Sequence, residues 1–374
     1  MTLHPPSGYR LQTPVVVRSP NWLGDAVMAL PAVRNLRTFL PPGARLDVAV
    51  PAKLAALWDA CPFVDHVLEM DEPKKIPLVA ELLQEGEYQT AVLLPNSLRV
   101  AAEAFSAGIP HTVAYPGHAR RWLISQLVEP APFNALHPHQ KYYYLDLIEA
   151  LGAPADASCP DLVLPADFQA PDLPGDAPLL VLCPGAEYGP AKRWPAERFS
   201  EVANHMRDRH GARVVVAGAK GDADVAAQVA AEVEGAVNLT GRTSLEEFMR
   251  LLAMARVVVG NDSGSMHLAS ALGTPVVGIF GSTEPRLTGP IGPPERARVL
   301  RHHVSCSPCF LRECPLDFAC MDSIASNQVL AAVEELWATT PAGGTRPPHR
   351  FRRARRPYSA RRKAPGPSRK IYRA

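Results

Sequence analysis

The sequence lacks the features that would place it among membrane, secreted or fibrous proteins. Its N-terminus contains no apolar segment of the kind that forms a signal peptide. The longest run without Asp, Glu, Lys or Arg lies between Asp262 and Glu284 and holds four glycines and a proline, so it predicts a helix, a turn and a strand, not a transmembrane helix. Seven unevenly spaced cysteines are too few for a disulfide scaffold. We therefore expect a cytosolic protein.

An excess of charge of one sign is also missing from the chain as a whole, which has 39 basic and 37 acidic residues. The charges are, however, distributed unevenly along the chain. Residues 341–374 contain 12 Lys and Arg and no Asp or Glu, which leaves 39 − 12 = 27 basic against 37 acidic residues in the first 340. Such a block is typical of a disordered, solubilising tail, and it could also contact anionic lipid or nucleic acid.

The length and composition predict two globular domains. With 374 residues, 47% hydrophobic and 20% charged, the chain is long enough for more than one ordinary core. Short apolar runs alternate with helical patterns in both halves, including a helical stretch from about 24 to 39 and a last helix at about 327–337. The runs lie at 15–18, 46–50, 91–94, 179–183, 214–217, 257–260 and 276–280.

Runs that are apolar on both faces and alternate with helices predict parallel sheets covered on both sides. The Pro-rich stretch 165–178 separates the two series. We expect an α/β protein with two doubly wound, Rossmann-like domains at 1–172 and 173–340, facing one another across a cleft, and a disordered basic tail at 341–374. A ligand would bind in the cleft at the carboxyl ends of the strands.

The first candidate motif, RSPNWLGD at 18–25, follows a strand and opens a helix. Asp25 would lie in the first helical turn, where the positive end of the helix dipole favours its ionised form. There it could take a proton from a hydroxyl nucleophile, or it could simply cap the helix.

The second motif, CPGAEYGPAKRWP at 183–195, follows the first strand of the second half. Lys192 and Arg193 would lie on a loop at the carboxyl end of that strand, where an anionic ligand is expected to bind. Arg can bind a phosphate group with two parallel hydrogen bonds, and Lys acts as a compact point charge. The spacing alone is equally compatible with a solvated surface loop.

The third motif, at 257–275, reads as strand, polar turn, helix and strand. Backbone N–H groups at the start of such a helix bind phosphate or diphosphate readily. Asp262 could cap the helix or bind a sugar hydroxyl, and His267 could be a satisfied core side chain or a ligand contact. The chain has neither GxxxxGK[ST] nor a GxGxxG after the first strand, which argues against a P-loop and a simple dinucleotide site.

Four cysteines, Cys306, Cys309, Cys314 and Cys320, are spaced C-x2-C-x4-C-x5-C. Four thiolates this close in sequence could hold a structural zinc ion, although the spacing is not that of a zinc ribbon. Free buried thiols and a redox-labile pair are the alternatives.

Four strings together resemble the bacterial ADP-heptose:lipopolysaccharide heptosyltransferases of glycosyltransferase family 9, and the type II members most closely. They are PNWLGDAVMALPAVR, LLPNS with AGIPH, CPGAEYGPAKRWP and NDSGSMHLASALGTPVVGIFGSTEP. The resemblance covers about residues 14–338 and implies a GT-B fold. It also implies an inverting, metal-independent transfer of L-glycero-D-manno-heptose from ADP-heptose, without a cofactor, to the first heptose of the inner core, on heptosyl-Kdo2-lipid A.

The same resemblance implies roles for individual residues. Asp25 would be the base that deprotonates the acceptor hydroxyl. The donor would be bound by Gly185, Lys192, Asp222, Thr243, Asp262, Ser263, Gly264 and His267. The acceptor would be bound by Asn21, Trp22, Asn96 and Ser97. Because the acceptor is lipid-anchored, we expect a cytoplasmic enzyme that is peripheral on the inner membrane, with the basic tail as an electrostatic tether to anionic lipid.

Two alternatives stay open. One is a related family 9 enzyme with another acceptor, such as heptosyltransferase I or III or a protein heptosyltransferase. Acceptor contacts would then differ in first-half loops such as 96–99, 117–121 and 141–144. The other is a non-enzymatic binder whose tail grips nucleic acid, with an affinity that collapses in salt. We expect no specific nucleic-acid partner, because Asp25, Lys192 and Asp262 are all present.

Overall fold

The computed structural model describes residues 11–130 and 138–340. The predicted parallel sheets are confirmed: the described residues form two six-stranded parallel sheets, ordered β3-β2-β1-β4-β5-β6 and β12-β11-β10-β7-β8-β9. The two orders are the same pattern read in opposite directions. In each sheet the strand order reverses beside the first strand, that is, between β1 and β4 and between β7 and β10. Ligands bind at this point in open α/β sheets.

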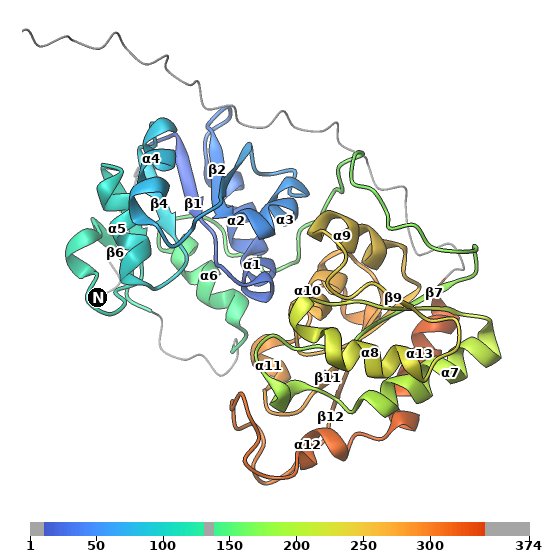
Figure 1. Ribbon diagram of the computed structural model, residues 1–374. Helices are drawn as coiled ribbons and strands as arrows, with labels where there is room; N and C mark the ends of the chain where they lie inside the picture. The colour runs from blue at the N-terminus through green and yellow to red at the C-terminus, as the bar shows by residue number, and fades with distance from the viewer. Residues whose placement is uncertain (1–10, 131–137, 341–374) are drawn as a thin grey trace, which may run out of the picture.

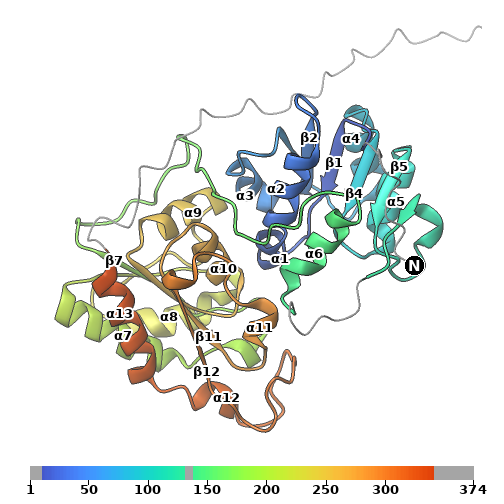
Figure 2. The same ribbon diagram turned by 180° about the vertical axis from the view of Figure 1, so that it is seen from behind.

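Figures 1 and 2 show the two sheets in separate lobes that lie side by side, with α1 and α10 between them. The strands of the first lobe are β1 (Val15–Arg18), β2 (Leu46–Pro51), β3 (His66–Met70), β4 (Thr90–Leu93), β5 (His111–Ala114) and β6 (Gln126–Leu127). Those of the second are β7 (Leu179–Cys183), β8 (Arg213–Val216), β9 (Val237–Asn238), β10 (Val257–Asn261), β11 (Val276–Phe280) and β12 (Ala297–Arg301).

Helices cover both faces of each sheet. The first lobe has α1 (Leu23–Met28), α2 (Leu30–Phe39), η1 (Ala52–Leu54), α3 (Ala55–Asp59), α4 (Ile76–Glu85), α5 (Leu98–Ser106), η2 (Arg121–Leu123) and α6 (Gln140–Glu149). The second has η3 (Pro190–Lys192), α7 (Ala196–His210), η4 (Lys220–Asp222), α8 (Ala223–Ala231), α9 (Leu245–Met254), α10 (Gly264–Ala271), α11 (Pro285–Thr288), η5 (Pro294–Arg296), α12 (Ala319–Asp322) and α13 (Ser326–Thr339). No helix in the described ranges is long and apolar enough to cross a membrane.

Alternation along the strands explains why both faces are covered. In β1, Val15 and Val17 point into one apolar core and Val16 into another, because successive side chains of a strand point to opposite faces. The core that contains Val15 and Val17 continues into the second lobe, where it includes Val258 of β10 and Leu268 of α10. The two lobes therefore share buried apolar surface.

The helical stretch expected from about 24 to 39 is helical in the structure, but it is divided into two helices. The chain turns at Ala29 between α1 and α2, and Pro31 occupies an early position of α2. Proline lacks an N–H and is tolerated only near a helix start, so it favours a new helix over continuation of the old one. The break makes α1 a short helix that can be aimed independently of α2.

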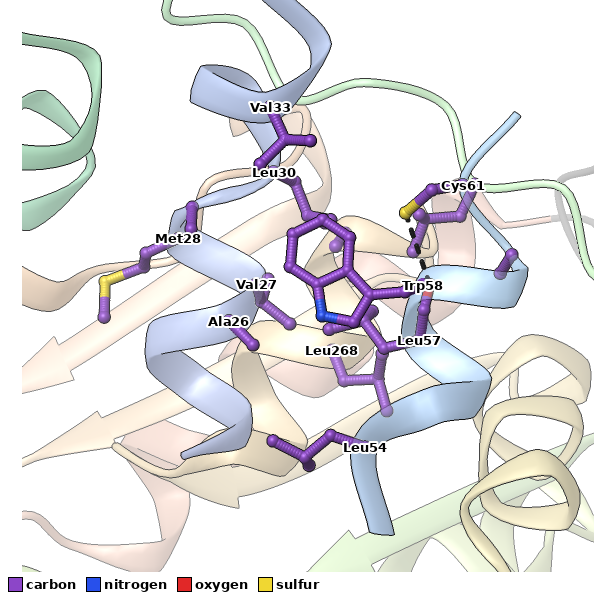
Figure 3. Close-up of a cluster of buried hydrophobic side chains, with 14 of the residues drawn as sticks. Ala26, Val27, Met28, Leu30, Val33, Leu54, Leu57, Trp58, Cys61 and Leu268 are labelled. Carbon is purple, nitrogen blue, oxygen red and sulfur yellow. Dashed lines mark hydrogen bonds between the residues drawn. The ribbon is translucent and has the colours of Figure 1, made fainter. Parts of the chain in front are cut away.

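The back of α1 is anchored in the shared core. Figure 3 shows Val27 beside Trp58 of α3, with Leu268 of α10 below them. Trp58 is fully buried, and its indole Nε1–H donates a hydrogen bond to Ser19 Oγ at 3.0 Å. The segment between β1 and α1 is thus held at its start by the Ser19 hydrogen bond and at its end by the packing of Val27. These contacts fix the first turn of α1 at the lobe interface.

Candidate active site between the lobes

The helices α1 and α10 approach each other closely because each has a glycine at the contact. A Cβ on Gly264 would lie 3.0 Å from Leu23 Cβ, and one on Gly24 would lie 3.1 Å from His267 Cδ2. Side chains larger than hydrogen would push the two helices apart. The first turns of α1 and α10 therefore meet across the lobe interface, and both open onto the same space.

That space is a cavity of about 750 Å³ lined by both lobes. Its walls include many of the predicted site residues, namely Trp22, Asp25, Lys192, Asp262, Ser263, Gly264 and His267. A smaller hollow of about 240 Å³ shares Ser263 and Gly264 with it and is lined by Gly185, Asp222 and Thr243. The two hollows form one continuous site of a size typical for small-molecule ligands.

Asp25 lies in the first turn of α1 but does not cap it: the N-cap is Trp22, and the cap position has no side-chain hydrogen bond. Gln140 Nε2 donates a 2.7 Å hydrogen bond to Asp25 Oδ1. Burial raises the pKa of the Asp25 carboxyl, while Gln140 and the charges of His267 and Lys192 act in the opposite direction. A carboxyl with a raised pKa is a stronger base once ionised, which suits proton abstraction.

On the side of the second lobe, Asp262 lies at the centre of a cluster of polar and charged side chains. Lys192 Nζ lies 2.6 Å from Asp262 Oδ2, and the hydroxyl of Thr283 donates to the same oxygen at 2.7 Å. Burial alone would raise the Asp262 pKa, but His267 and Lys192 outweigh it and lower the pKa to about 2. Asp262 therefore stays ionised and fixes the ammonium group of Lys192 at the cavity wall.

Two buried polar atoms at this cluster have no hydrogen-bond partner within the described residues: Ser263 Oγ and His267 Nδ1. The other ring nitrogen of His267 lies 3.7 Å from Asp262 Oδ1, which is too far for a hydrogen bond. His267 is therefore a buried histidine that pairs with Asp262 through one ring nitrogen and leaves the other without a partner in the described residues. Unpartnered buried groups at a helix N-terminus indicate a polar ligand.

In the smaller hollow, Gly185 permits a contact that other residues would not. A Cβ there would lie 2.0–2.3 Å from the carboxyl atoms of Asp222. Asp222 accepts a hydrogen bond from the backbone N–H of Ala219 at 3.1 Å and lies 3.5 Å from Arg193 Nη2. Burial raises the Asp222 pKa, and Ala219 and Arg193 oppose that effect.

Three of the predicted acceptor residues do not line either hollow. Asn21 accepts a 3.1 Å hydrogen bond from Arg18 Nη2. Asn96 accepts one from Arg120 Nη2 at 2.8 Å, and Ser97 Oγ caps α5 by accepting from the Val100 N–H. Only Trp22, which is 48% exposed, faces the large cavity.

The four cysteines considered above as possible ligands of a structural zinc ion lie near one another: burial raises the pKa of the Cys320 thiol, and the other three cysteines add to that effect. Cys306, Cys309, Cys314 and Cys320 are free thiols, and the described part of the chain has no group of three or more His, Cys, Asp or Glu placed to hold a metal ion. The loop instead contributes Phe310 and Arg312 to the large cavity. Tyr188 OH donates to Phe310 O at 2.7 Å, so this loop packs against the segment that carries Lys192.

Sequence reasoning missed several residues of the cavity, among them Gln140, Thr283, Thr288, Tyr188 and Arg312. Thr283 is the last residue of the string GIFGST, a few residues beyond the third motif, so its closeness to that motif was an available signal. Gln140 opens a helix far from every motif, and nothing local marks it.

We compared the sequence and the structure of the chain with those of known proteins. Residues 78–319 match the model of glycosyltransferase family 9 (heptosyltransferase). The chain is 31% identical to lipopolysaccharide heptosyltransferase 2 of Escherichia coli K12 over 77% of this chain and 87% of that protein. The structure of E. coli ADP-heptose lps heptosyltransferase II superposes with a TM-score of 0.74 at 28% identity, covering 87% of this chain and 99% of the other.

A second solved structure, E. coli heptosyltransferase WaaC with ADP, shares the fold with a TM-score of 0.66 at 22% identity, covering 86% of this chain and 99% of that one. The expected GT-B architecture is confirmed by both superpositions. The chain belongs to glycosyltransferase family 9, the heptosyltransferases.

Proposed function

We propose that the chain transfers heptose from ADP-heptose to the first heptose of the lipopolysaccharide inner core. One observation carries the proposal: Asp25 from the first lobe and Lys192, Asp262 and His267 from the second line a single cavity. A base on one side and an anion-binding cluster on the other is the arrangement that glycosyl transfer requires. Curated relatives named heptosyltransferase 2 support the type of acceptor.

The donor would span both hollows. In this arrangement the nucleoside lies in the smaller hollow beside Gly185, Asp222 and Thr243, and the heptose lies in the larger one beside Asp262. The diphosphate between them would be bound by the backbone N–H groups of Ser263 and Gly264 at the start of α10 and by Lys192. The unpartnered Ser263 Oγ and His267 Nδ1 would gain partners there.

The reaction would be one in-line displacement. Asp25 takes the proton of the acceptor hydroxyl, whose oxygen forms a bond to the anomeric carbon. The bond from that carbon to the diphosphate oxygen breaks, and its electron pair leaves with ADP, so the configuration inverts. Lys192 and the α10 N-terminus stabilise the charge on the departing diphosphate. This chemistry asks for no metal ion or cofactor, and we propose that none is used.

The acceptor would enter from the side of Trp22 and the first lobe. Because it is lipid-anchored, we propose that the enzyme acts peripherally at the cytoplasmic face of the inner membrane. The basic tail at 341–374 and its proposed role as a tether lie outside the described residues. A first-lobe acceptor site also leaves room for the second candidate, a family 9 enzyme with another acceptor.

A coupled assay of ADP release from ADP-heptose tests the proposal. Release that depends on heptosyl-Kdo2-lipid A supports it. Release with Kdo2-lipid A alone would make the chain a type I enzyme. Release with neither acceptor, despite binding of the donor, would contradict the proposed acceptor and favour another one within the family.

A further inference from the structure

The start of α6 contacts the candidate base directly. Gln140, the first residue of α6, donates from Nε2 to Asp25 Oδ1 at 2.7 Å, and the same nitrogen lies 3.4 Å from the hydroxyl oxygen of Tyr144. A carboxylate can only accept hydrogen bonds, so the amide N–H group, and not the amide oxygen, must face Asp25 in its ionised form. This contact fixes the direction in which the free carboxylate oxygen points.

The residue before Gln140 crosses to the other lobe. His139 is the N-cap of α6, and its Nδ1 accepts the backbone N–H of Lys141 at 3.1 Å. Its Nε2 lies 3.0 Å from the backbone oxygen of Gly289. With Nδ1 as acceptor, Nε2 carries the hydrogen and donates to Gly289. Burial lowers the pKa of His139 to about 4, so the ring is neutral near pH 7 and keeps this tautomer.

On the far side, Gly289 directly follows α11, which contacts the donor cluster. Thr288 Oγ1 lies 3.5 Å from Asp262 Oδ2, at the edge of hydrogen-bonding distance. Leu287 and Thr288 also line the large cavity. A short series of contacts therefore runs from Asp262 through Thr288 and Gly289 to His139, and from there to Gln140 and Asp25.

We propose that Gln140 is a positioning residue for Asp25, and that the hydrogen bond from His139 to Gly289 of the second lobe holds the start of α6, and with it Gln140, in place. The proposal rests on the proposed function, because it assumes that Asp25 is the base. It assigns to α6 a role that none of the sequence motifs carries: the contact with the donor lobe aligns the base. Positioning a reacting group correctly is worth a large share of the rate in such reactions.

The polar and charged groups that face Asp25 determine how the loss of the Gln140 side chain would change the pKa of Asp25. They are Gln140 and Tyr144 of α6, His267 of α10 and Lys192 of η3. Burial raises the Asp25 pKa most, and the Gln140 hydrogen bond is foremost among the effects that lower it. Removing the amide therefore raises that pKa, so a higher pH is needed to ionise the base.

Two substitutions of Gln140 separate positioning from packing. Gln140→Ala removes the side chain, whereas Gln140→Glu keeps its shape but replaces the N–H donor with a second carboxyl, whose charge also opposes ionisation of Asp25. Both should lower kcat about tenfold or more, shift the acidic limb of the kcat profile to higher pH, and leave the KM for ADP-heptose nearly unchanged. Gln84→Ala, in the exposed part of α4, is the matched control and should match the wild type.

His139→Asn tests the link between the lobes. Asparagine is a good N-cap, so α6 keeps its cap, but its shorter side chain does not reach Gly289. We expect a lower kcat with the same upward shift of the acidic limb. The double variant His139→Asn with Gln140→Ala should be no slower than Gln140→Ala alone, because both changes act on one contact.

The outcomes separate this inference from the proposed function. If Asp25→Asn abolishes transfer while Gln140→Ala and Gln140→Glu keep the wild-type kcat and pH profile, the positioning role is refuted and the proposed function stands. If the Gln140 variants change but His139→Asn does not, the link between the lobes is refuted. If Asp25→Asn keeps wild-type turnover, the base assignment fails and both proposals fall with it.

Discussion

Replacing Lys192 with methionine should destabilise the second lobe by an amount that the structure allows us to work out. Lys192 Nζ lies 2.6 Å from Asp262 Oδ2, with 12% and 3% of the two side chains exposed. Against the effect of burial, His267 and Lys192 together lower the pKa of Asp262 from an ordinary 3.8 to about 2, which corresponds to roughly 2 kcal/mol in favour of the ionised folded state, of which Lys192 supplies a part. Removing one partner of a buried ion pair typically costs about 3–5 kcal/mol.

Asp262 keeps the Thr283 hydroxyl after this substitution, so we expect the lower end of that range, a loss of about 3 kcal/mol in the free energy of unfolding at pH 7. The sign of the pH dependence follows from the lowered pKa. The stabilisation is fully present above about pH 4, where Asp262 is ionised even in the unfolded chain. It is lost as the pH falls toward 2, where the folded carboxyl takes up its proton.

Urea unfolding of the wild type and Lys192→Met between pH 7 and pH 3 measures this difference. The difference in the free energy of unfolding between the wild type and Lys192→Met should become smaller toward pH 3. The double variant Lys192→Met with Asp262→Asn should be more stable than Lys192→Met alone, because it leaves no uncompensated buried charge. A loss below about 0.5 kcal/mol, or a gap that does not change with pH, would refute the reasoning.

Three further predictions concern the donor side. Gly185→Ala should weaken binding of ADP by tenfold or more in calorimetry, because a Cβ would lie 2.0–2.3 Å from the Asp222 carboxyl atoms; unchanged affinity would exclude this hollow as the nucleotide site. Thr283→Val should lower the free energy of unfolding by about 1.5 kcal/mol, since it deletes a buried hydroxyl that donates to the charged Asp262; equal urea midpoints would contradict this. Transfer activity should survive exhaustive treatment with EDTA if Lys192 stabilises the departing diphosphate, and restoration of lost activity by added metal would contradict it.

The sequence was enough to predict the architecture, because the strands at the centre of each sheet are continuous apolar runs. β1, β7 and β11 have the predicted bounds to the residue. The edge strands and the short interior strand β5 were not predicted. β6 and β9 have two residues each, and β3 and β12 include charged side chains, so their patterns do not stand out from loops.

The motifs predicted the part of the site that follows single strands and opens helices. Asp25, Lys192 and Asp262 each follow the carboxyl end of a central strand. Topology brings Lys192 and Asp262 to one edge of the second sheet and Asp25 to the corresponding edge of the first. Gln140 and Arg312 reach the same cavity from segments that no strand positions. The contact of Gln140 with the cavity depends on how the two lobes dock, and Arg312 is placed by its hydrogen bonds with Tyr188 and Ala191, neither of which local sequence patterns encode.

The acceptor roles predicted for Asn96 and Ser97 stay predictions, and the structure gives both side chains other contacts. Asn96 and Ser97 follow β4, so they satisfy the same rule as Asp25. In the folded chain, however, Asn96 accepts a hydrogen bond from Arg120, and the Ser97 hydroxyl caps α5. Polar residues after a strand have structural uses as well as functional ones, and the sequence alone does not distinguish them.

The most direct test of the account compares the wild type with Asp25→Asn in ADP release from ADP-heptose in the presence of heptosyl-Kdo2-lipid A. Asparagine keeps the shape of the side chain but cannot take a proton. The account predicts a loss of at least about a hundredfold in kcat, with binding of ADP retained. Turnover close to that of the wild type would contradict the assignment of Asp25 as the base and, with it, the proposed mechanism.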